Sequence, residues 1–227
     1  MEAVVDPEPI DVYVDIICPY AFQTSLWLRD LVTQGVVTVR WRFFSLEEIN
    51  RPDGKPHPWE RSWAYGFSMM RIGALLARQD PALWDQWYLA AGTALHVDGL
   101  KAHTPEVARS LLAQIELDPG LVDEALNDPS TAAEVRADHE SIVARGTFGV
   151  PTIVFRDDQA LFGPVLIDPP VGSDARALWD LVSGWRRFPH LYELKRPKEA
   201  EDLGAIAETF APYLAARDWQ SIQRPAP

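Results

Sequence analysis

The chain has 227 residues, of which 47% are hydrophobic and 24% charged, and it carries a net charge of −12. This composition is typical of a soluble globular protein, and the acidic balance argues against nucleic acid or an anionic membrane as partner, since both need a basic surface. With one cysteine, no recognisable secretory signal and no apolar run of membrane-spanning length, the sequence predicts a cytoplasmic protein.

The first elements form a strand–helix–strand pattern. Val12, Val14 and Ile16 alternate with the other residues of a predicted strand that ends at Cys18. Pro19 stands where a helix would begin, because its fixed φ and missing N–H cost nothing there. The helix is predicted to run to about Thr33, and a second strand covers 36–44. This spacing indicates a βαβ unit with parallel strands.

A Pro-rich segment at 51–58 separates the predicted βαβ unit from a region of predicted helices. Helices are predicted at 59–78, 81–97, 105–116 and 119–127, and a further helix begins with Ser130 as its cap and stops at Gly146. A β-hairpin follows (149–155 and 160–162), then a helix at 174–187. The tail offers one amphipathic helix, at about 202–217, before a polar stub.

The order of elements predicts an α/β fold: a thioredoxin-like sheet with an inserted all-helical domain. The thioredoxin-like domain would be discontinuous, formed by 10–54 and 129–196, with the helical insertion at 55–128 and a C-terminal extension at 197–227. A substrate is expected in the crevice between the sheet and the insertion.

Cys18 is the first candidate reactive group. It precedes the first turn of a helix, where free backbone N–H groups and the helix dipole favour an anion. The position predicts a thiolate with a pKa lowered to about 3.5–7.5. The alternative is a small buried hydrophobic side chain, as most free cysteines are. The Cys18-Pro19 pair at a strand–helix junction favours the reactive group.

The second signal is Val150-Pro151-Thr152, in which a proline opens a strand. An ordinary trans proline would suit this place. In a thioredoxin fold, however, a cis proline sits opposite the helix-capping cysteine, so the pairing with Cys18 favours a cis bond. Backbone polar groups of Val150 would then be available to an extended thiol-bearing ligand.

The chain resembles the DsbA-like branch of the thioredoxin superfamily and, within it, the mycothiol-dependent nitroreductase family. The resemblance rests on CPYAF (18–22), FFSL (43–46), GVPTIVF (149–155), FGPVL (162–166) and LWDL…FPHLYELKR (178–196). It implies a thiol-dependent oxidoreductase with Cys18 as catalytic residue in an active-site motif completed by Pro19, Tyr20 and Ala21. Val150, Pro151 and Thr152 would bind the thiol ligand, mycothiol or glutathione, which would serve as co-substrate.

Members of the family carry Cys-Pro-x-Cys, whereas this chain has Ala21 at the fourth position. Side chains at i and i+3 of a helix are neighbours, so the missing thiol is the one that would resolve a mixed disulfide. Dithiol chemistry is therefore excluded. Monothiol chemistry remains, in which a second small thiol resolves the mixed disulfide, and so does binding of the thiol without redox change. The expected substrate is small and aromatic or electrophilic.

Two other functions stay open. Kappa-class glutathione transferases and 2-hydroxychromene-2-carboxylate isomerases often have serine at this place and activate glutathione itself. They typically carry an Asp-Arg pair shortly after a Phe-Gly element, whereas here Asp174 and Arg176 follow only later. The third possibility is a binding protein that kept the fold and lost catalysis.

His96 and Phe22 are candidates for a substrate pocket, since His96 ends a helix of the insertion and could face the crevice. The alternative for His96 is a structural, hydrogen-bonded histidine. His57, His103 and His139 are expected on the surface. We expect no metal, flavin or nicotinamide, because the sequence has neither a metal-ligand spacing nor a Gly-rich phosphate loop. Exposed tryptophans would suit a homodimer.

Overall fold

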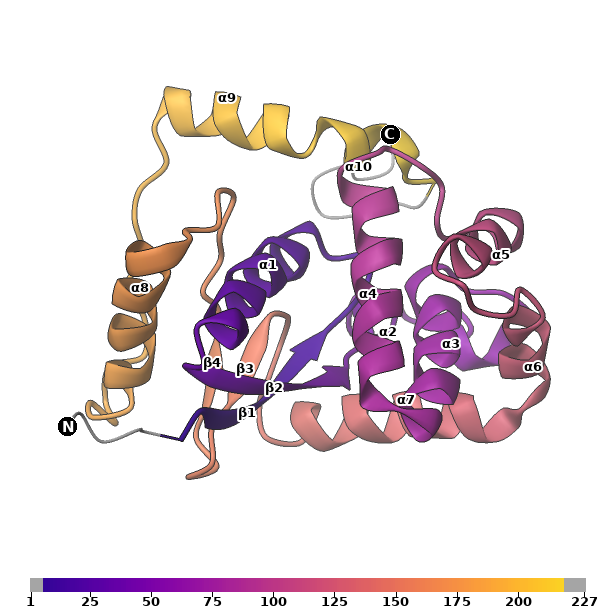
Figure 1. The fold of residues 1–227 in the computed structure, drawn as a ribbon, viewed down its shortest axis with the longest axis horizontal. Coiled ribbons are helices and arrows are strands. Elements are labelled where there is room, and N and C mark those ends of the chain that lie inside the picture. Colours follow the sequence, from indigo (N-terminus) through magenta and orange to yellow (C-terminus); the bar gives the residue numbers. More distant parts are fainter. Residues whose placement is uncertain (1–5, 219–227) are drawn as a thin grey trace.

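The computed structural model describes residues 6–218, and its centre is a four-stranded sheet (Figure 1). The strands are β1 (Glu8–Val14), β2 (Val37–Phe43), β3 (Thr152–Val154) and β4 (Ala160–Phe162), in the spatial order β2-β1-β3-β4. β1 and β2 are parallel, whereas β3 is antiparallel to β1 and β4 to β3. The predicted βαβ unit and hairpin are both present. The N-terminal residues 1–5 and the polar stub at 219–227 lie outside the described residues.

The first strand ends earlier than its alternation suggests. β1 stops at Val14, and the chain turns before α1 (Pro19–Thr33) begins. The carboxylate of Asp15 accepts a hydrogen bond from the Ile17 N–H at 3.1 Å, and the Cys18 N–H donates to the Asp15 carbonyl at 3.0 Å. Pro19 opens the helix as predicted. This turn brings Cys18 from the strand to the helix N-terminus.

Helices fill the chain between β2 and β3. They are α2 (Leu46–Ile49), the 3₁₀ turn η1 (Pro58–Glu60), α3 (Tyr65–Gln79), α4 (Pro81–His96), α5 (Pro105–Gln114), α6 (Leu121–Asn127) and α7 (Pro129–Val143), and α8 (Gly172–Trp185) follows β4. The predicted cap of α7 is wrong: Asp128, not Ser130, accepts from the backbone, with Pro129 at the first helical position. In the described part of the chain, no helix has the length and apolar character that a membrane crossing would need.

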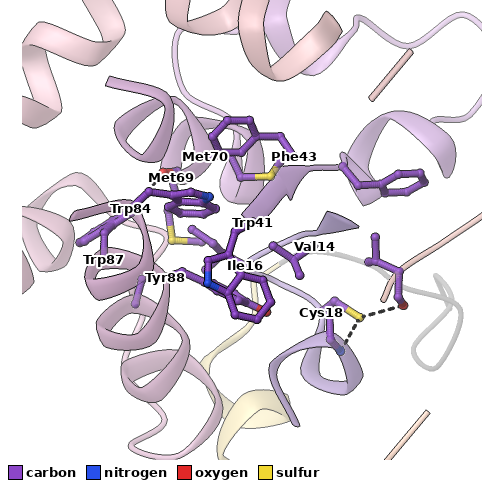
Figure 2. Close-up of a cluster of buried hydrophobic side chains, with 14 of the residues drawn as sticks. Val14, Ile16, Cys18, Trp41, Phe43, Met69, Met70, Trp84, Trp87 and Tyr88 are labelled. Atoms are coloured by element: carbon purple, nitrogen blue, oxygen red, sulfur yellow. Dashed lines mark hydrogen bonds between the residues drawn. The ribbon is translucent and has the colours of Figure 1, made fainter. Parts of the chain in front are cut away.

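The sheet and the inserted helices share one hydrophobic core. Trp41 and Phe43 of β2 contact Tyr88 and Trp84 of α4, with ring centroids 5.3 and 5.0 Å apart. Met69 of α3 is fully buried in the same cluster. Cys18 belongs to the same buried cluster, and Figure 2 shows it at the edge of the cluster, near Val14 and Ile16. The helices therefore form part of the environment of Cys18, while the domain limits given above remain predictions.

The C-terminal extension contains two helices where the sequence predicted one. α9 (Ala200–Thr209) and α10 (Ala211–Ala216) meet at Phe210, which has non-helical backbone angles. Pro212 lacks an N–H and cannot continue the hydrogen bonding of α9, which explains the break. Figure 1 shows α9, in yellow, crossing from α8 towards the upper end of α4, where α10 packs.

Candidate functional site

Cys18 lies between the N-terminus of α1 and the loop that precedes β3. Its Sγ accepts a hydrogen bond from the Ala21 N–H at 3.4 Å and caps the helix. On its other side the thiol donates to the Val150 carbonyl, with 3.7 Å between sulfur and oxygen. Dashed lines in Figure 2 mark both bonds. The sulfur thus faces the segment that the sequence predicted to lie opposite it.

The pKa of Cys18 moves in the direction opposite to the prediction. Burial removes the sulfur from water and raises the pKa of the thiol to about 12, and the charge of Asp15 adds to the increase. Hydrogen bonds from the Ala21 and Tyr20 backbone lower the pKa by less. The expectation of a lowered pKa is therefore wrong for this conformation, because loss of hydration outweighs the helix N-terminus. Here Cys18 is a neutral thiol.

Asp15 is a site residue that the sequence analysis missed. It is fully buried, and burial raises its pKa from 3.8 to about 7. Its second oxygen accepts from the Leu46 N–H at 2.7 Å, which ties the end of β1 to the start of α2. A single acidic residue inside the apolar run before Cys18 was the available signal. The carboxyl provides a second titratable group close to the sulfur.

The Val150–Pro151 peptide bond is cis, as predicted, and so is Gly163–Pro164, which was not predicted. Val150 and Thr152 are buried, and the Thr152 hydroxyl donates to the Gly149 carbonyl at 2.8 Å. The predicted ligand-binding segment therefore lies beside Cys18, and its backbone oxygen at Val150 faces the sulfur. The binding role of these residues remains a prediction.

Phe148 and Phe162 are further residues that the sequence analysis did not single out. Their rings are 4.7 Å apart, and they are 68% and 46% exposed. They flank the Gly149–Thr152 segment, since a Cβ on Gly149 would lie 3.2 Å from the Phe162 ring. An exposed aromatic pair next to the predicted thiol-binding segment is a surface on which a small ligand could pack.

The structure brings His96 and Phe22 together, with ring centroids 5.1 Å apart. His96 is buried, and its Nε2 lies 2.7 Å from the Ile16 carbonyl, so Nε2 carries the proton and donates. Burial lowers the pKa of His96 to about 4. The ring is therefore neutral near pH 7, and its Nδ1 has no hydrogen-bond partner among the described residues.

The C-terminal extension covers this part of the site, which the sequence analysis did not foresee. Tyr213 of α10 contacts His96 with ring centroids 5.2 Å apart, and Phe210 packs edge-on against Tyr20 at 4.9 Å. The only sequence signal was the presence of aromatic residues in the tail, Phe210 and Tyr213 among them. With these rings in place, the side chains of His96 and Phe22 are buried, at 2% and 1% exposure.

Two surface hollows lie away from Cys18. One, of about 480 Å³, is lined by Asp157, Arg186 and neighbours on α8, and the other, of about 500 Å³, lies along β1 and β2.

The prediction that His103 and His139 lie on the surface is wrong, since both side chains are buried. The Nδ1 of His139 accepts a hydrogen bond from the Ser45 N–H. Within residues 6–218 no three His, Cys, Asp or Glu side chains gather closely enough to hold a metal ion.

Comparison with known proteins identifies relatives over most of the chain. Residues 17–196 match the family model Rv2466c-like, described as mycothiol-dependent nitroreductase Rv2466c. A Mycobacterium tuberculosis protein described as uncharacterized, Rv2286c, is 54% identical over 95% of this chain and 93% of its own length.

Solved structures share the fold at low sequence identity. A 2-hydroxychromene-2-carboxylate isomerase superposes with a TM-score of 0.57 at 16% identity, covering 79% of this chain and 95% of its own. The cytosolic disulfide reductase DsbM from Pseudomonas aeruginosa gives a TM-score of 0.52 at 15% identity, covering 79% and 99%. The fold is therefore thioredoxin-like, of the DsbA type.

Proposed function

Because the chain belongs to the Rv2466c-like family of mycothiol-dependent nitroreductases, we propose that it is a monothiol oxidoreductase in which Cys18 exchanges thiols with mycothiol or glutathione. The observation that carries the proposal is the position of Sγ, between the Ala21 N–H and the Val150 carbonyl. Cys18 is also the only cysteine of the chain, so no internal thiol can resolve a disulfide formed there.

The exchange proceeds through a mixed disulfide. The Cys18 thiolate attacks the disulfide of the small thiol, a new sulfur–sulfur bond forms, and the departing thiolate takes up a proton. A second small thiol then attacks the mixed disulfide and restores Cys18. In a reductive turnover two small thiols supply two electrons and two protons and leave as one disulfide. A small aromatic or electrophilic substrate takes up the two electrons and the two protons.

Two features support a thiol ligand at this place. The Val150 carbonyl accepts a hydrogen bond from the Cys18 thiol in the resting protein, and it becomes free for a ligand N–H once the sulfur is in a disulfide. Mycothiol and glutathione both contain amide N–H groups. The exposed rings of Phe148 and Phe162 lie beside Gly149, next to the predicted thiol-binding segment, and offer a surface for the rest of the ligand or for the substrate.

The decisive experiment is to expose reduced protein to mycothiol disulfide or glutathione disulfide and to measure the intact mass. We expect a gain of one small thiol per chain, reversed by the free thiol and absent in Cys18→Ser. Because burial keeps the pKa of the thiol near 12, the gain should be slow near pH 7 and faster at higher pH. Failure of both disulfides to add to Cys18, even at alkaline pH, would contradict the proposal.

A second function is favoured by one observation. A thiol that stays neutral and donates a hydrogen bond can act as a serine hydroxyl would, by donating to the thiolate of a bound glutathione or mycothiol. The chain would then be a transferase or isomerase of the kappa-class type. Calorimetry with the reduced thiol separates the two functions: Cys18→Ser should keep binding and activity in this second case and lose thiol exchange in the first. A chain that shows neither behaviour would be a binding protein.

A further inference from the structure

The short helix α10 places two aromatic rings on side chains of the Cys18 site. Tyr213 packs on His96 and Phe210 packs on Tyr20, and both tail rings are only 4% exposed. Tyr20 is two residues from Cys18 in the same helical turn. His96 is hydrogen-bonded to Ile16, two residues before Cys18. The tail therefore covers both flanks of the turn that carries the sulfur.

The part of the chain that leads to α10 contributes little to its attachment. No residue of α9 is buried, and residues 191–199 before it have no regular secondary structure and are almost all exposed. The contacts of α10 itself include its packing on α4, Pro212 against Gly99, and the ion pairs of Asp218 with Lys101 at 2.8 Å and with His103 at 3.2 Å. Because α9 and residues 191–199 contain no buried residue, the local contacts of α10 are what hold it in place, and a segment attached in this way can open without unfolding the sheet.

The surface beneath α10 has the character of a ring-binding site. The His96 ring lies between Phe22 and Tyr213, and Tyr20 provides a further aromatic wall. The buried Nδ1 of His96 is an acceptor without a partner among residues 6–218. If α10 moved away, an aromatic surface with one free acceptor would lie against the turn that carries the sulfur, which suits a planar ligand that carries a hydrogen-bond donor.

We propose that α10 is a displaceable cover, and that Phe210 and Tyr213 occupy a subsite that takes the aromatic ring of a ligand when the helix moves away. This inference rests on the proposed function in one respect, namely that Cys18 is the reactive group. It assigns the substrate to planar aromatic compounds and makes access to Cys18 depend on the tail.

The first test uses 1-chloro-2,4-dinitrobenzene as an aromatic probe and iodoacetamide as a small aliphatic one. With the aromatic probe the Cys18 sulfur forms a bond to the ring carbon, the carbon–chlorine bond breaks, chloride leaves and the thiol proton goes to water. Removing a buried ring contact should favour opening by about 1.4 kcal/mol, so Phe210→Ala and Tyr213→Ala should each react with the aromatic probe about tenfold faster than the unaltered chain.

The matched control is Leu203→Ala, which removes an exposed apolar side chain of the same tail and should leave both rates unchanged. Circular dichroism establishes that each variant is folded. Equal rates in the unaltered chain and in the two ring variants, including no reaction in any of them, would overturn the cover. An equal gain for both probes would overturn the aromatic subsite.

The second measurement needs no variant. Hydrogen exchange of the α10 amides is compared in the unaltered chain carrying the dinitrophenyl group or the small carbamidomethyl group on Cys18. The aromatic adduct should displace α10 and speed its exchange by about tenfold more than the small one, with α3 unaffected. Equal protection of the α10 amides in the two adducts would contradict the inference. Neither test requires a mixed disulfide, so failure of thiol exchange and failure of the cover are observed separately.

Discussion

The two sides of Cys18 are built from different interactions. On the side of the cis prolines, hydrogen bonds hold the chain: the Gly163 N–H donates to the Pro151 carbonyl at 2.8 Å, and the Thr24 hydroxyl donates to the Pro164 carbonyl at 2.7 Å. On the side of α10, Phe210 and Tyr213 pack ring against ring on Tyr20 and His96.

This difference suggests which side can change. A hydrogen bond is lost when its partners shift by a fraction of an ångström or turn away, and a buried carbonyl left alone is costly. Ring packing is non-directional by comparison, and another ring can replace it. We therefore expect the proline side to stay fixed as a template for the thiol ligand, whereas the α10 side exchanges its rings for those of a substrate.

The largest effect is expected from Ala21→Cys, which changes the chemistry between the two sides. The Ala21 N–H lies 3.4 Å from the Cys18 sulfur, and the two residues share the first helical turn. The variant should form an internal disulfide on mild oxidation and release any small thiol bound to Cys18. Intact mass, with a loss of two hydrogens and no adduct, measures this. A variant that retains a stable adduct would show that the turn cannot bring the two sulfurs together.

The next effect concerns Asp15, which ties the end of β1 to α2. The folded protein binds its proton more tightly than the unfolded chain, because burial raises the pKa from 3.8 to about 7. The stability due to the protonated carboxyl is present below about pH 4 and is lost as the pH rises through 7, by up to about 4 kcal/mol.

Asp15→Asn removes this titration. The difference in unfolding free energy between the unaltered chain and the variant should therefore fall between pH 4 and 7 and then level off. Urea unfolding at a series of pH values measures it. The comparison with the variant is needed because His96, whose pKa burial lowers, changes stability in the opposite sense over an overlapping range. A difference that is constant with pH would contradict a raised pKa at Asp15.

Gly92→Ala tests the packing beneath α10. A Cβ there would lie 2.6 Å from Cε2 of Phe22, so the ring that supports His96 must move. We expect a loss of about 2 kcal/mol of stability from overpacking. The matched control is Gly204→Ala on α9, which meets nothing within 4 Å and should cause no loss of stability, because alanine is the better helix former. Similar values for both variants in urea unfolding would show that Gly92 is not constrained.

The fixed side of the site could be predicted from sequence and the covered side could not. Pro19 after a strand and Pro151 before one are local signals, and their pairing follows from the order of elements. The contact of Tyr213 with His96 joins residues more than a hundred positions apart and leaves no periodic pattern. Aromatic residues such as Phe210 and Tyr213 in a tail predict burial, but they do not show which surface the rings will cover.

The prediction of a lowered pKa for Cys18 failed for a related reason. The sequence shows that a helix begins at Pro19, which favours an anion, but it does not show how completely neighbouring segments exclude water from the sulfur. The start of α3 illustrates the same limit. Its Phe67 N–H is capped by the carboxylate of Glu47, 20 residues earlier, so the helix begins at Tyr65 and not near 59 as predicted.

The smallest effects come from a pair of variants that tests the comparison directly. Thr152→Val keeps the shape of a buried side chain and removes its hydrogen bond to Gly149, so about 1 kcal/mol of global stability should be lost. Lys101→Gln removes an exposed ion pair with Asp218, which should change global stability by less than about 0.5 kcal/mol.

Hydrogen exchange should show the reverse order at α10. Lys101→Gln weakens a contact that holds the tail, so exchange there should quicken by about twofold, while Thr152→Val should leave it unchanged. If the tail were part of the same cooperative unit as the sheet, both variants would act on α10 only through global stability, and Thr152→Val would have the larger effect. That order of effects would mean that the two sides of Cys18 open together, and that α10 is not a cover.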